Sequence, residues 1–572
     1  MTSEAETGEG EKRGALQALA VYLERRSLVM LALGFSSGLP NLLIFDTLSA
    51  WLRDAGLSLE VIAFFGLATL AYSLKFLWAP LVDRATVPGL TRLLGHRRSW
   101  MLVCQGAIML GLWGVAGTDP IVSLGLMAAL AVLVGFVSAT QDIVIDAWRI
   151  EAAVTEKQGA MAAAYQWGYR IAMIVAGVAP LALSDYAGWS VSYAIMALLM
   201  LVGVLGVVGA PREAQHVIRR IDTGGIPAAP ARDALEWTIR LALFVLGALV
   251  LGSGLAGNAA ILQAGLSTVG LTGAGEAVAE VWTGKPWGAF FQVGGVALGG
   301  IVIFLAARPA PGLRTRPGRY MSAALGEPLA DFFGRYGRSA AAILALICVY
   351  RLSDFVLNIM NPFYLDMGYS KLEIAEVRKV LGAVMSVIGV GLGGFAIARL
   401  GLMRSLVIGA FAGPLSNLVF AWLALQGPQL WALSVAIGVD NIASGFAGTC
   451  LIAYMSSLTG QGFTATQYAL FSSLYALLGK LVASQSGRVV EGAAGAADGG
   501  AFVGLTALFA RLPPEAFAGA MEKSGVTPAA LGAGYVVFFV YSALLGTLGV
   551  ALAFWVARSA ARREKAARSG GL

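Results

Sequence analysis

Two aspartates one helical turn apart are the residues of this chain best suited to chemistry. Asp142 and Asp146 lie within the apolar stretch 121–148, and their spacing puts both carboxylates on one face of a helix. A charge in hydrocarbon is costly, so such groups are functional candidates, and repulsion and burial both favour protonation of one of them. The pair is a candidate proton carrier, with Asp142 first. Alternatively, Asp146 and Arg149 form a structural clamp at the helix end.

A second polar stretch interrupts the apolar run 340–365. Arg351, Asp354, Asn358 and Asn361 follow one another at spacings of three, four and three, which predicts one polar face along a continuous helix. Arg351 and Asp354 could simply neutralise each other, but the asparagines also need partners, which favours a water-filled cavity. An internal repeat aligns Asp46 with Asn358, so each half supplies a polar residue at this depth.

An arginine preceded by aromatic residues indicates what such a cavity would bind. Arg170 follows Tyr165, Gln166 and Trp167 and lies about twelve residues into its apolar stretch. Arginine binds carboxylates with two parallel hydrogen bonds, and aromatic rings pack on sugar faces, so this group suits an anionic, hydroxyl-rich ligand. Cations flanked by carboxylates are typical of a proton-coupled site for a large anionic solute.

Other polar residues lie singly in the apolar stretches. Lys75 is close enough to a membrane surface to extend out of the hydrocarbon instead of lining a site. We count Asp354, Asp46 and Asp440 with the first two aspartates as candidate proton carriers. The remaining candidate ligand-binding residues are Gln141, Lys75, Asn441, Tyr468 and Lys480.

A charged loop follows the second apolar stretch. It contains Asp83, Arg84, Arg97 and Arg98, and it resembles the gating loop of major facilitator transporters, in which an aspartate bridges to basic groups. The alternative is an ordinary basic loop on the cytoplasmic side of a membrane.

The composition excludes a soluble enzyme. Hydrophobic residues make up 58% of the 572 and charged residues only 13%. The three cysteines all lie in apolar runs, and the two histidines, His96 and His216, lie in loops, so we expect no metal site and no cofactor. There is no nucleophile–base pattern and no phosphate-binding loop, which leaves a membrane enzyme or a non-transporting receptor as distant alternatives.

The elements that position these residues are about fourteen apolar segments, each long enough to cross a bilayer. The first is too long for a signal peptide, so we expect it to remain as a span. Basic residues mark alternate loops, which predicts that both termini are cytoplasmic. The expected spans are 28–52, 59–82, 99–117, 121–148, 159–184, 189–210, 238–258, 286–306, 340–365, 372–398, 403–425, 429–457, 463–486 and 532–557.

The chain repeats itself, which divides it into two halves. Residues 51–58 are echoed at 363–370, and Gln158, Gly159, Ala162 and Tyr165 recur 303 positions later. Parallel halves around an axis normal to the membrane follow from this spacing. We expect a tail at 1–27, six-helix halves at 28–210 and 339–557, linkers with an inserted hairpin at 211–338, a periplasmic insertion at 488–531 with short helices at 505–509 and 516–521, and a basic tail at 558–572.

Five motifs give the chain a recognisable resemblance. They are 34–40 (GFSSGLP), 74–81 (LKFLWAPL), 141–147 (QDIVIDA), 362–366 (PFYLD) and 463–470 (FTATQYAL). Together they resemble the AmpG-type muropeptide permeases of the major facilitator superfamily. The resemblance implies an all-α membrane fold in the bacterial inner membrane. It also implies proton-driven import of anhydromuropeptides from the periplasm, with an indirect role in β-lactamase induction and antibiotic resistance.

The expected partners follow from this resemblance. They are the anhydromuropeptide, protons and the lipid bilayer; we expect no nucleic acid and a monomer. The nearest alternative is a related carrier of another anionic solute, such as acetyl-CoA.

Overall fold

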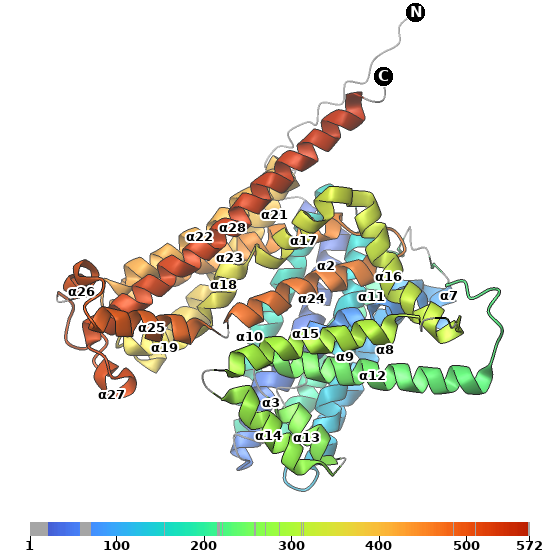
Figure 1. The fold of residues 1–572 in the computed structure, drawn as a ribbon, viewed down its shortest axis with the longest axis horizontal. Helices are drawn as coiled ribbons and strands as arrows, with labels where there is room; N and C mark the ends of the chain where they lie inside the picture. Colours follow the sequence, from blue (N-terminus) through green and yellow to red (C-terminus); the bar gives the residue numbers. More distant parts are fainter. Residues whose placement is uncertain are drawn as a thin grey trace, which may run out of the picture.

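The computed structural model describes residues 21–57, 70–153, 155–213, 218–219, 221–256, 259–268, 270–284, 287–309, 312, 314–483, 485–509 and 511–569. Throughout these ranges the only regular elements are helices (Figure 1). Eleven of the helices are long and apolar enough to cross a membrane, or twelve if a bent pair, Ser486–Asp498 with Val503–Phe509, counts as one span.

The N-terminal half is built around a long helix packed against the first one. α2 (Arg25–Leu42) continues through a π-helical turn, η2 (Leu43–Thr47), into α3 (Leu48–Asp54). α2 and α10 approach so closely that a Cβ on Gly34 or Gly168 would overlap the facing backbone. The other elements are η1 (Val21–Leu23), α5 (Leu70–Leu74), η4 (Lys75–Leu77), α6 (Ala79–Arg84), α7 (Leu90–Leu94), α8 (His96–Ala116), α9 (Leu124–Ala152), α10 (Thr155–Leu199, bent at Gly188) and α11 (Leu201–Gly209).

In the C-terminal half, a helix that the sequence predicted to be continuous is interrupted. The segment 340–366 is divided into α17 (Ala340–Val349), α18 (Leu352–Val356), η6 (Leu357–Ile359) and α19 (Met360–Asp366). Its neighbours are α20 (Lys371–Glu376), η7 (Val377–Leu381, π-helical), α21 (Gly382–Leu400), α22 (Leu402–Ala424), α23 (Leu430–Ser457), α24 (Thr464–Ala483), α25 (Ser486–Asp498), α26 (Val503–Phe509), α27 (Ala520–Ser524) and α28 (Pro528–Ser569).

The segment between the halves contains a pair of packed helices and an amphipathic one. α12 (Pro230–Ala256) packs along α15 (Gly288–Ala307), and the shorter α13 (Ala260–Thr268) and α14 (Thr272–Thr283) lie between them in sequence. α16 (Arg316–Tyr336) and η5 (Gly337–Ser339) then lead into α17.

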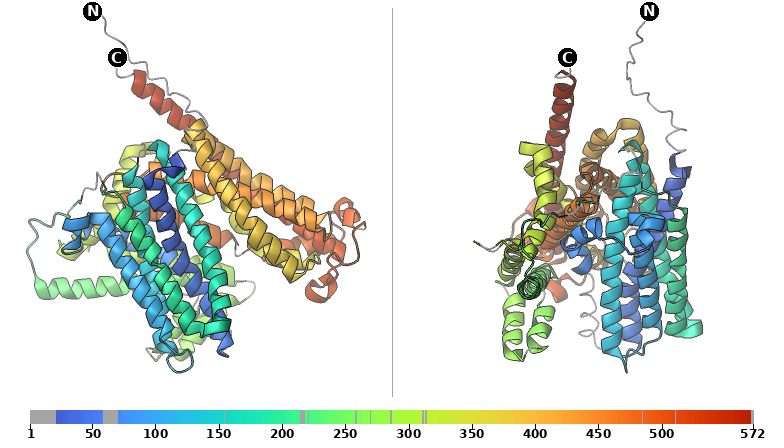
Figure 2. Two further views of the ribbon diagram at one scale, coloured as in Figure 1. Left: turned by 180° about the vertical axis from the view of Figure 1, so that it is seen from behind. Right: turned by 90° about the vertical axis from the view of Figure 1, so that its right-hand side faces the viewer.

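The two halves meet at one end and diverge towards the other (Figure 2). We call the meeting end, where α2 begins and α28 ends, the terminal end, and the opposite one the far end. Among the described residues, all hydrogen bonds between the halves lie from the terminal end to the middle of the helices. α10 of one half packs on α21 and α23 of the other, and α24 contacts both halves.

The predicted helix count is not reproduced. The stretches 157–209 and 316–366 each count as one candidate span, although the first is interrupted at Gly188 and the second is divided into several helices. The second predicted span falls partly on 58–69, outside the described residues. The prediction that 488–531 is largely irregular is wrong for its first part. α25 occupies 486–498 because its small residues Ala494 and Ala497 bury against α28.

Candidate substrate and proton sites

Asp142 lies buried at the centre of a hydroxyl cluster in the N-terminal half. Its side-chain environment comes from three helices, α2, α9 and α10, and the residue is only 7% exposed. Ser37 Oγ donates a hydrogen bond to Asp142 Oδ1, and the Tyr165 hydroxyl lies 2.9 Å from Ser37 Oγ. A carboxylate with two hydroxyls in sequence can exchange a proton along that chain.

A cation and two further tyrosines surround this carboxylate. Lys75, 8% exposed on η4, interacts electrostatically with Asp142. Tyr169 accepts a hydrogen bond of 2.5 Å from Asn41 Nδ2, and Tyr72 donates one of 2.8 Å to Ser138. Sequence reasoning missed these hydroxyl and amide residues, although isolated polar residues inside apolar stretches were a signal that could have identified them.

Gln141 points away from Asp142. Its Nε2 donates 3.1 Å to Ser36 Oγ, to which Gln105 Nε2 also donates, so the side chain sits in the packing between α2, α8 and α9. Adjacent residues of a helix point in different directions, so Gln141 packs between helices although it is next to Asp142 in the sequence.

In the C-terminal half, Arg351 and Asp354 form the ion pair considered as an alternative above. Arg351 contacts the Asp354 carboxylate at 2.8 Å and donates 2.5 Å to Ser444 Oγ on α23. Asp440, also on α23, accepts a hydrogen bond of 3.3 Å from Ser416. Asn441 donates to the carbonyl of Ile437 in its own helix.

Arg170 faces Arg351 from the opposite half. The two guanidinium groups are close enough to interact electrostatically, and their like charges repel. Among the described residues no hydrogen bond or ion pair is made by Arg170, which is partly exposed. Tyr475 of α24 interacts with both arginines. Two nearby cations from separate halves, one of them without a hydrogen bond or ion pair among the described residues, form a place where an anion binds favourably.

Asp146 and Arg149 form the predicted clamp, and it extends across the halves. Arg149 lies 3.1 Å from Asp146. It also donates 2.8 Å to Ser456 on α23, and its guanidinium lies 5.2 Å from the ring centre of Tyr468 on α24. Asp146 and Tyr468 are therefore placed in a contact between the halves, one turn nearer the terminal end than Asp142.

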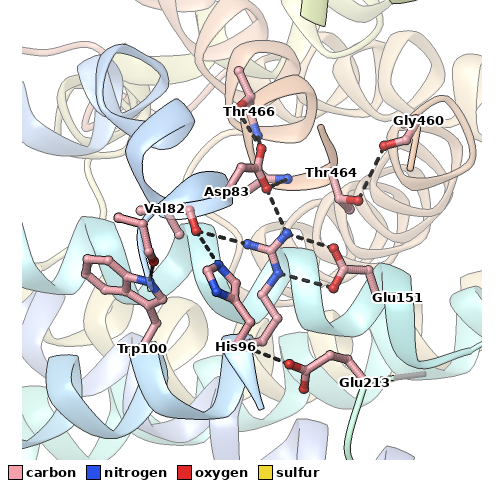
Figure 3. A network of polar contacts seen from close by, with 12 residues as sticks. Val82, Asp83, His96, Trp100, Glu151, Glu213, Gly460, Thr464 and Thr466 are labelled. Carbon is pink, nitrogen blue, oxygen red and sulfur yellow. Dashed lines mark hydrogen bonds and ion pairs between the residues drawn. The ribbon is translucent and has the colours of Figure 1, made fainter. Parts of the chain in front are cut away.

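Asp83, which the sequence placed in a loop and the structure places in α6, connects the halves at the terminal end (Figure 3). Its carboxylate, 1% exposed, accepts hydrogen bonds from the backbone of Ala465 (3.2 Å) and Thr466 (2.8 Å) and from Thr466 Oγ1 (2.6 Å). These are donors of the first turn of α24, where a negative charge is stabilised by the helix dipole. Arg97 pairs with Asp83 at 2.7 Å and with Glu151 at 2.7 Å.

The other two residues of the predicted gating loop have different neighbours. Arg84 pairs with Glu327 of α16 at 3.3 Å and lies 5.8 Å from the ring centre of Phe463. Arg98 donates to the carbonyl of Val207 within its own half. The loop therefore places Asp83 and Arg84 at the boundary between halves and Arg98 away from it.

The aromatic and amide residues before Arg170 also lie between the halves. Trp167 Nε1 donates 2.9 Å to the carbonyl of Val387, and its ring stacks on Tyr22 with centres 5.0 Å apart. Gln166 Nε2 donates 3.2 Å to Thr449 Oγ1. In this conformation both side chains make contacts between halves.

The two asparagines do not continue a polar stripe, because the helix that carries them is interrupted. Asn358 Nδ2 donates 3.0 Å to the carbonyl of Ala483, the last residue of α24, and Asn361 accepts from Arg378. Asp46 is exposed beside η2, and its carboxylate has no partner among the described residues. The side chain of Lys480 on α24 lies outside the described residues.

Comparisons with known proteins agree with a carrier. A family model described as acetyl-coenzyme A transporter 1 matches residues 27–187. The putative transporter AmpG 4 of Rickettsia conorii is 28% identical over 474 residues, covering 82% of this chain and 91% of that protein. The anhydromuropeptide permease of Escherichia coli K12 is 29% identical over 478 residues, covering 83% and 76%. The chain is similar to both groups of transporters, and its similarity to the AmpG proteins extends over most of its length.

The chain is a multi-pass membrane protein, as the sequence predicted, and the proteins to which it is similar are named as transporters. Among solved structures, the proton:xylose symporter XylE is similar with a TM-score of 0.47 and 10% identity, covering 93% of this chain and 95% of that one.

Proposed function

We propose that the transporter imports anhydromuropeptides from the periplasm by alternating access, driven by protons. The observation that carries the proposal is the facing pair Arg170 and Arg351, of which Arg170 has no partner among the described residues. A muropeptide offers peptide carboxylates to this pair and sugar faces to the nearby tyrosines. The relative named anhydromuropeptide permease extends over most of the chain, which supports the same cargo.

The proposed coupling group is Asp142. It is buried, it is hydrogen-bonded to Ser37, and Lys75 lies nearby as a competing partner. In this mechanism protonation of Asp142 and occupation of the arginine pair favour the same conformational change, so a proton and a muropeptide cross together. The terminal end, closed here by Asp83 and Arg149, is then the cytoplasmic gate.

The cargo is tested by uptake into vesicles that contain the purified full chain. Labelled anhydrodisaccharide-tripeptide is added outside, with and without an imposed proton gradient. We expect uptake that depends on the gradient and that collapses with a proton ionophore. If an excess of unlabelled muropeptide does not reduce the uptake of the labelled compound, the proposal is wrong.

Acetyl-CoA is the second candidate, because the matching family model carries that description over 27–187. Its phosphates and thioester are also anionic, so the arginine pair alone does not separate the two solutes. A competition assay separates the two solutes. Strong inhibition of uptake by acetyl-CoA, with no inhibition by unlabelled muropeptide, would favour acetyl-CoA as the cargo.

A further inference from the structure

A basic side chain outside the candidate residues lies towards the far end of the C-terminal half. Arg378 belongs to η7, a five-residue π-helical turn between α20 and α21. Such turns are uncommon, and they occur frequently at functional sites. The side chain of Arg378 is exposed, whereas Val377 one position earlier is buried against the core.

The guanidinium of Arg378 rests on neutral groups. Its Nη1 donates to Asn361 Oδ1 of α19, and its centre lies 5.8 Å from the ring centre of Tyr364. No carboxylate of the described residues lies within ion-pair distance of it. Arginine has five donors, and in the described part of the structure only one hydrogen bond uses them.

Arg378 shares a surface with the central arginine pair. Asp440 interacts electrostatically with both Arg351 and Arg378, so both cations lie near the same carboxylate. Along the interrupted helix, Asn361 comes ten positions after Arg351, which corresponds to roughly 15 Å at helical rise. An extended tripeptide or tetrapeptide spans about 10–14 Å, so one muropeptide is long enough to reach both places.

We propose that Arg378 and Asn361 form an outer subsite that binds a carboxylate of the cargo's peptide, while the rest of the molecule lies at Arg170 and Arg351. This inference rests on the proposed function and adds a determinant of specificity to it. The subsite includes Asn361 of α19, and α19 lies at the far end of the C-terminal half (Figure 1), so the subsite contacts cargo that approaches from the far end.

A purely structural role is the competing explanation. Arg378 could hold the π-helical turn against α19 through Asn361, and its loss would then destabilise the protein without any preference among ligands. Stability and ligand preference therefore have to be measured on the same variants.

The test is equilibrium binding to the purified full chain in detergent. The ligands are the anhydrodisaccharide-tripeptide and the same molecule with its peptide carboxyl groups amidated. The variants are Arg378→Gln, Arg378→Lys and, as matched control, Arg399→Gln, which removes an exposed arginine from the opposite end of α21. Thermal midpoints are recorded for each.

We expect Arg378→Gln to weaken binding of the carboxylate ligand about tenfold or more and to leave the amidated ligand unchanged. Arg378→Lys should retain part of the affinity, and Arg399→Gln all of it. If Arg378→Gln weakens the binding of both ligands equally and lowers the thermal midpoint, Arg378 has a purely structural role. If Arg378→Gln changes neither affinity, the cargo does not contact Arg378. Each of these two results overturns the inference. If wild-type protein binds neither ligand, the proposed function itself is wrong.

Discussion

At the scale of single residues, the two halves contribute different chemistry. The N-terminal half holds a buried carboxylate, Asp142, within a cluster of hydroxyls. The C-terminal half holds Arg351 in an ion pair, so its charge is mostly neutralised by Asp354. Arg170 makes no ion pair among the described residues, so its charge attracts an anionic cargo more strongly than that of Arg351.

Replacing Asp142 by asparagine tests the coupling step. Because the amide keeps the shape but cannot carry a proton, gradient-driven uptake in vesicles should fall about tenfold or more, while exchange of cargo without a gradient persists. The matched control is Asp185→Asn, which changes an exposed aspartate in α10. Undiminished uptake that still follows the gradient would remove Asp142 as the coupling group.

Replacing Arg170 tests the anion site. A charged hydrogen bond contributes about 1.5–3 kcal/mol, so Arg170→Ala should weaken binding of a carboxylated muropeptide roughly tenfold to a hundredfold. Binding of a bare anhydrodisaccharide should be weakened less by the same substitution. The affinity of Arg170→Lys for the carboxylated muropeptide should lie between those of the wild type and Arg170→Ala. Binding measured by calorimetry distinguishes these outcomes, and an equal loss for both ligands would indicate a structural arginine.

The sequence identified most of these charged residues because a charge inside an apolar stretch is conspicuous. It could not show which of them pair with each other. Asp142 and Asp146 lie one turn apart on the same face of a helix, yet their partners differ. Asp146 belongs to the clamp between the halves, and Asp142 belongs to the hydroxyl cluster. Tyr165 was predicted, but the serines, Tyr72, Tyr169 and Asn41 were missed, because hydroxyls and amides are common in membrane helices and carry little signal singly.

At the scale of elements, α24 is the helix on which both halves depend. Its first turn is capped by Asp83 of the other half, and along its length it packs on α9, α6, α17 and α18. Sequence analysis predicted this span but not its function as a bridge, since contacts between distant segments depend on tertiary packing. The interruption at Arg351 was unpredictable, because no proline or glycine lies beside it. The one at Leu357–Ile359 had a signal in Pro362, whose ring clashes with the carbonyl four positions earlier.

Neutralising Asp83 should loosen the terminal end. Asp83→Asn removes the charge at the first turn of α24 and one partner of Arg97, so conformations open at this end should gain population. With the native cysteines replaced, labelling of Thr449→Cys by a water-soluble thiol reagent should rise several-fold. Asp222→Asn, an exposed aspartate in the linker, serves as control; unchanged labelling would show that Asp83 does not hold the gate.

At the scale of the whole molecule, closure at one end is shared among several contacts. Arg149 with Ser456, Asp83 with Thr466 and Gln166 with Thr449 form a series from the terminal end to the middle of the helices. The linker helix α16 joins the same region, since Gln467 of α24 contacts Pro328 and Asp331.

Locking this arrangement should stop transport. Cysteines at Gln166 and Thr449, joined by a short thiol-reactive linker, should abolish uptake in vesicles, because the halves could no longer separate at this end. A cleavable linker should restore uptake on reduction. Each single cysteine variant treated in the same way is the control, and uninterrupted uptake by the linked protein would contradict alternating access at this boundary.

The interrupted segment α17–α19 and the segment where α24 ends exchange hydrogen bonds with each other. Asn358 supplies a donor to the final carbonyl of α24, and Ser486, which opens α25, supplies one to the carbonyl of Val356. Straightening either helix alone would leave a carbonyl oxygen without its donor, and for the buried carbonyl of Val356 the free-energy cost is comparable to a lost hydrogen bond. We therefore expect the two segments to change conformation together during transport.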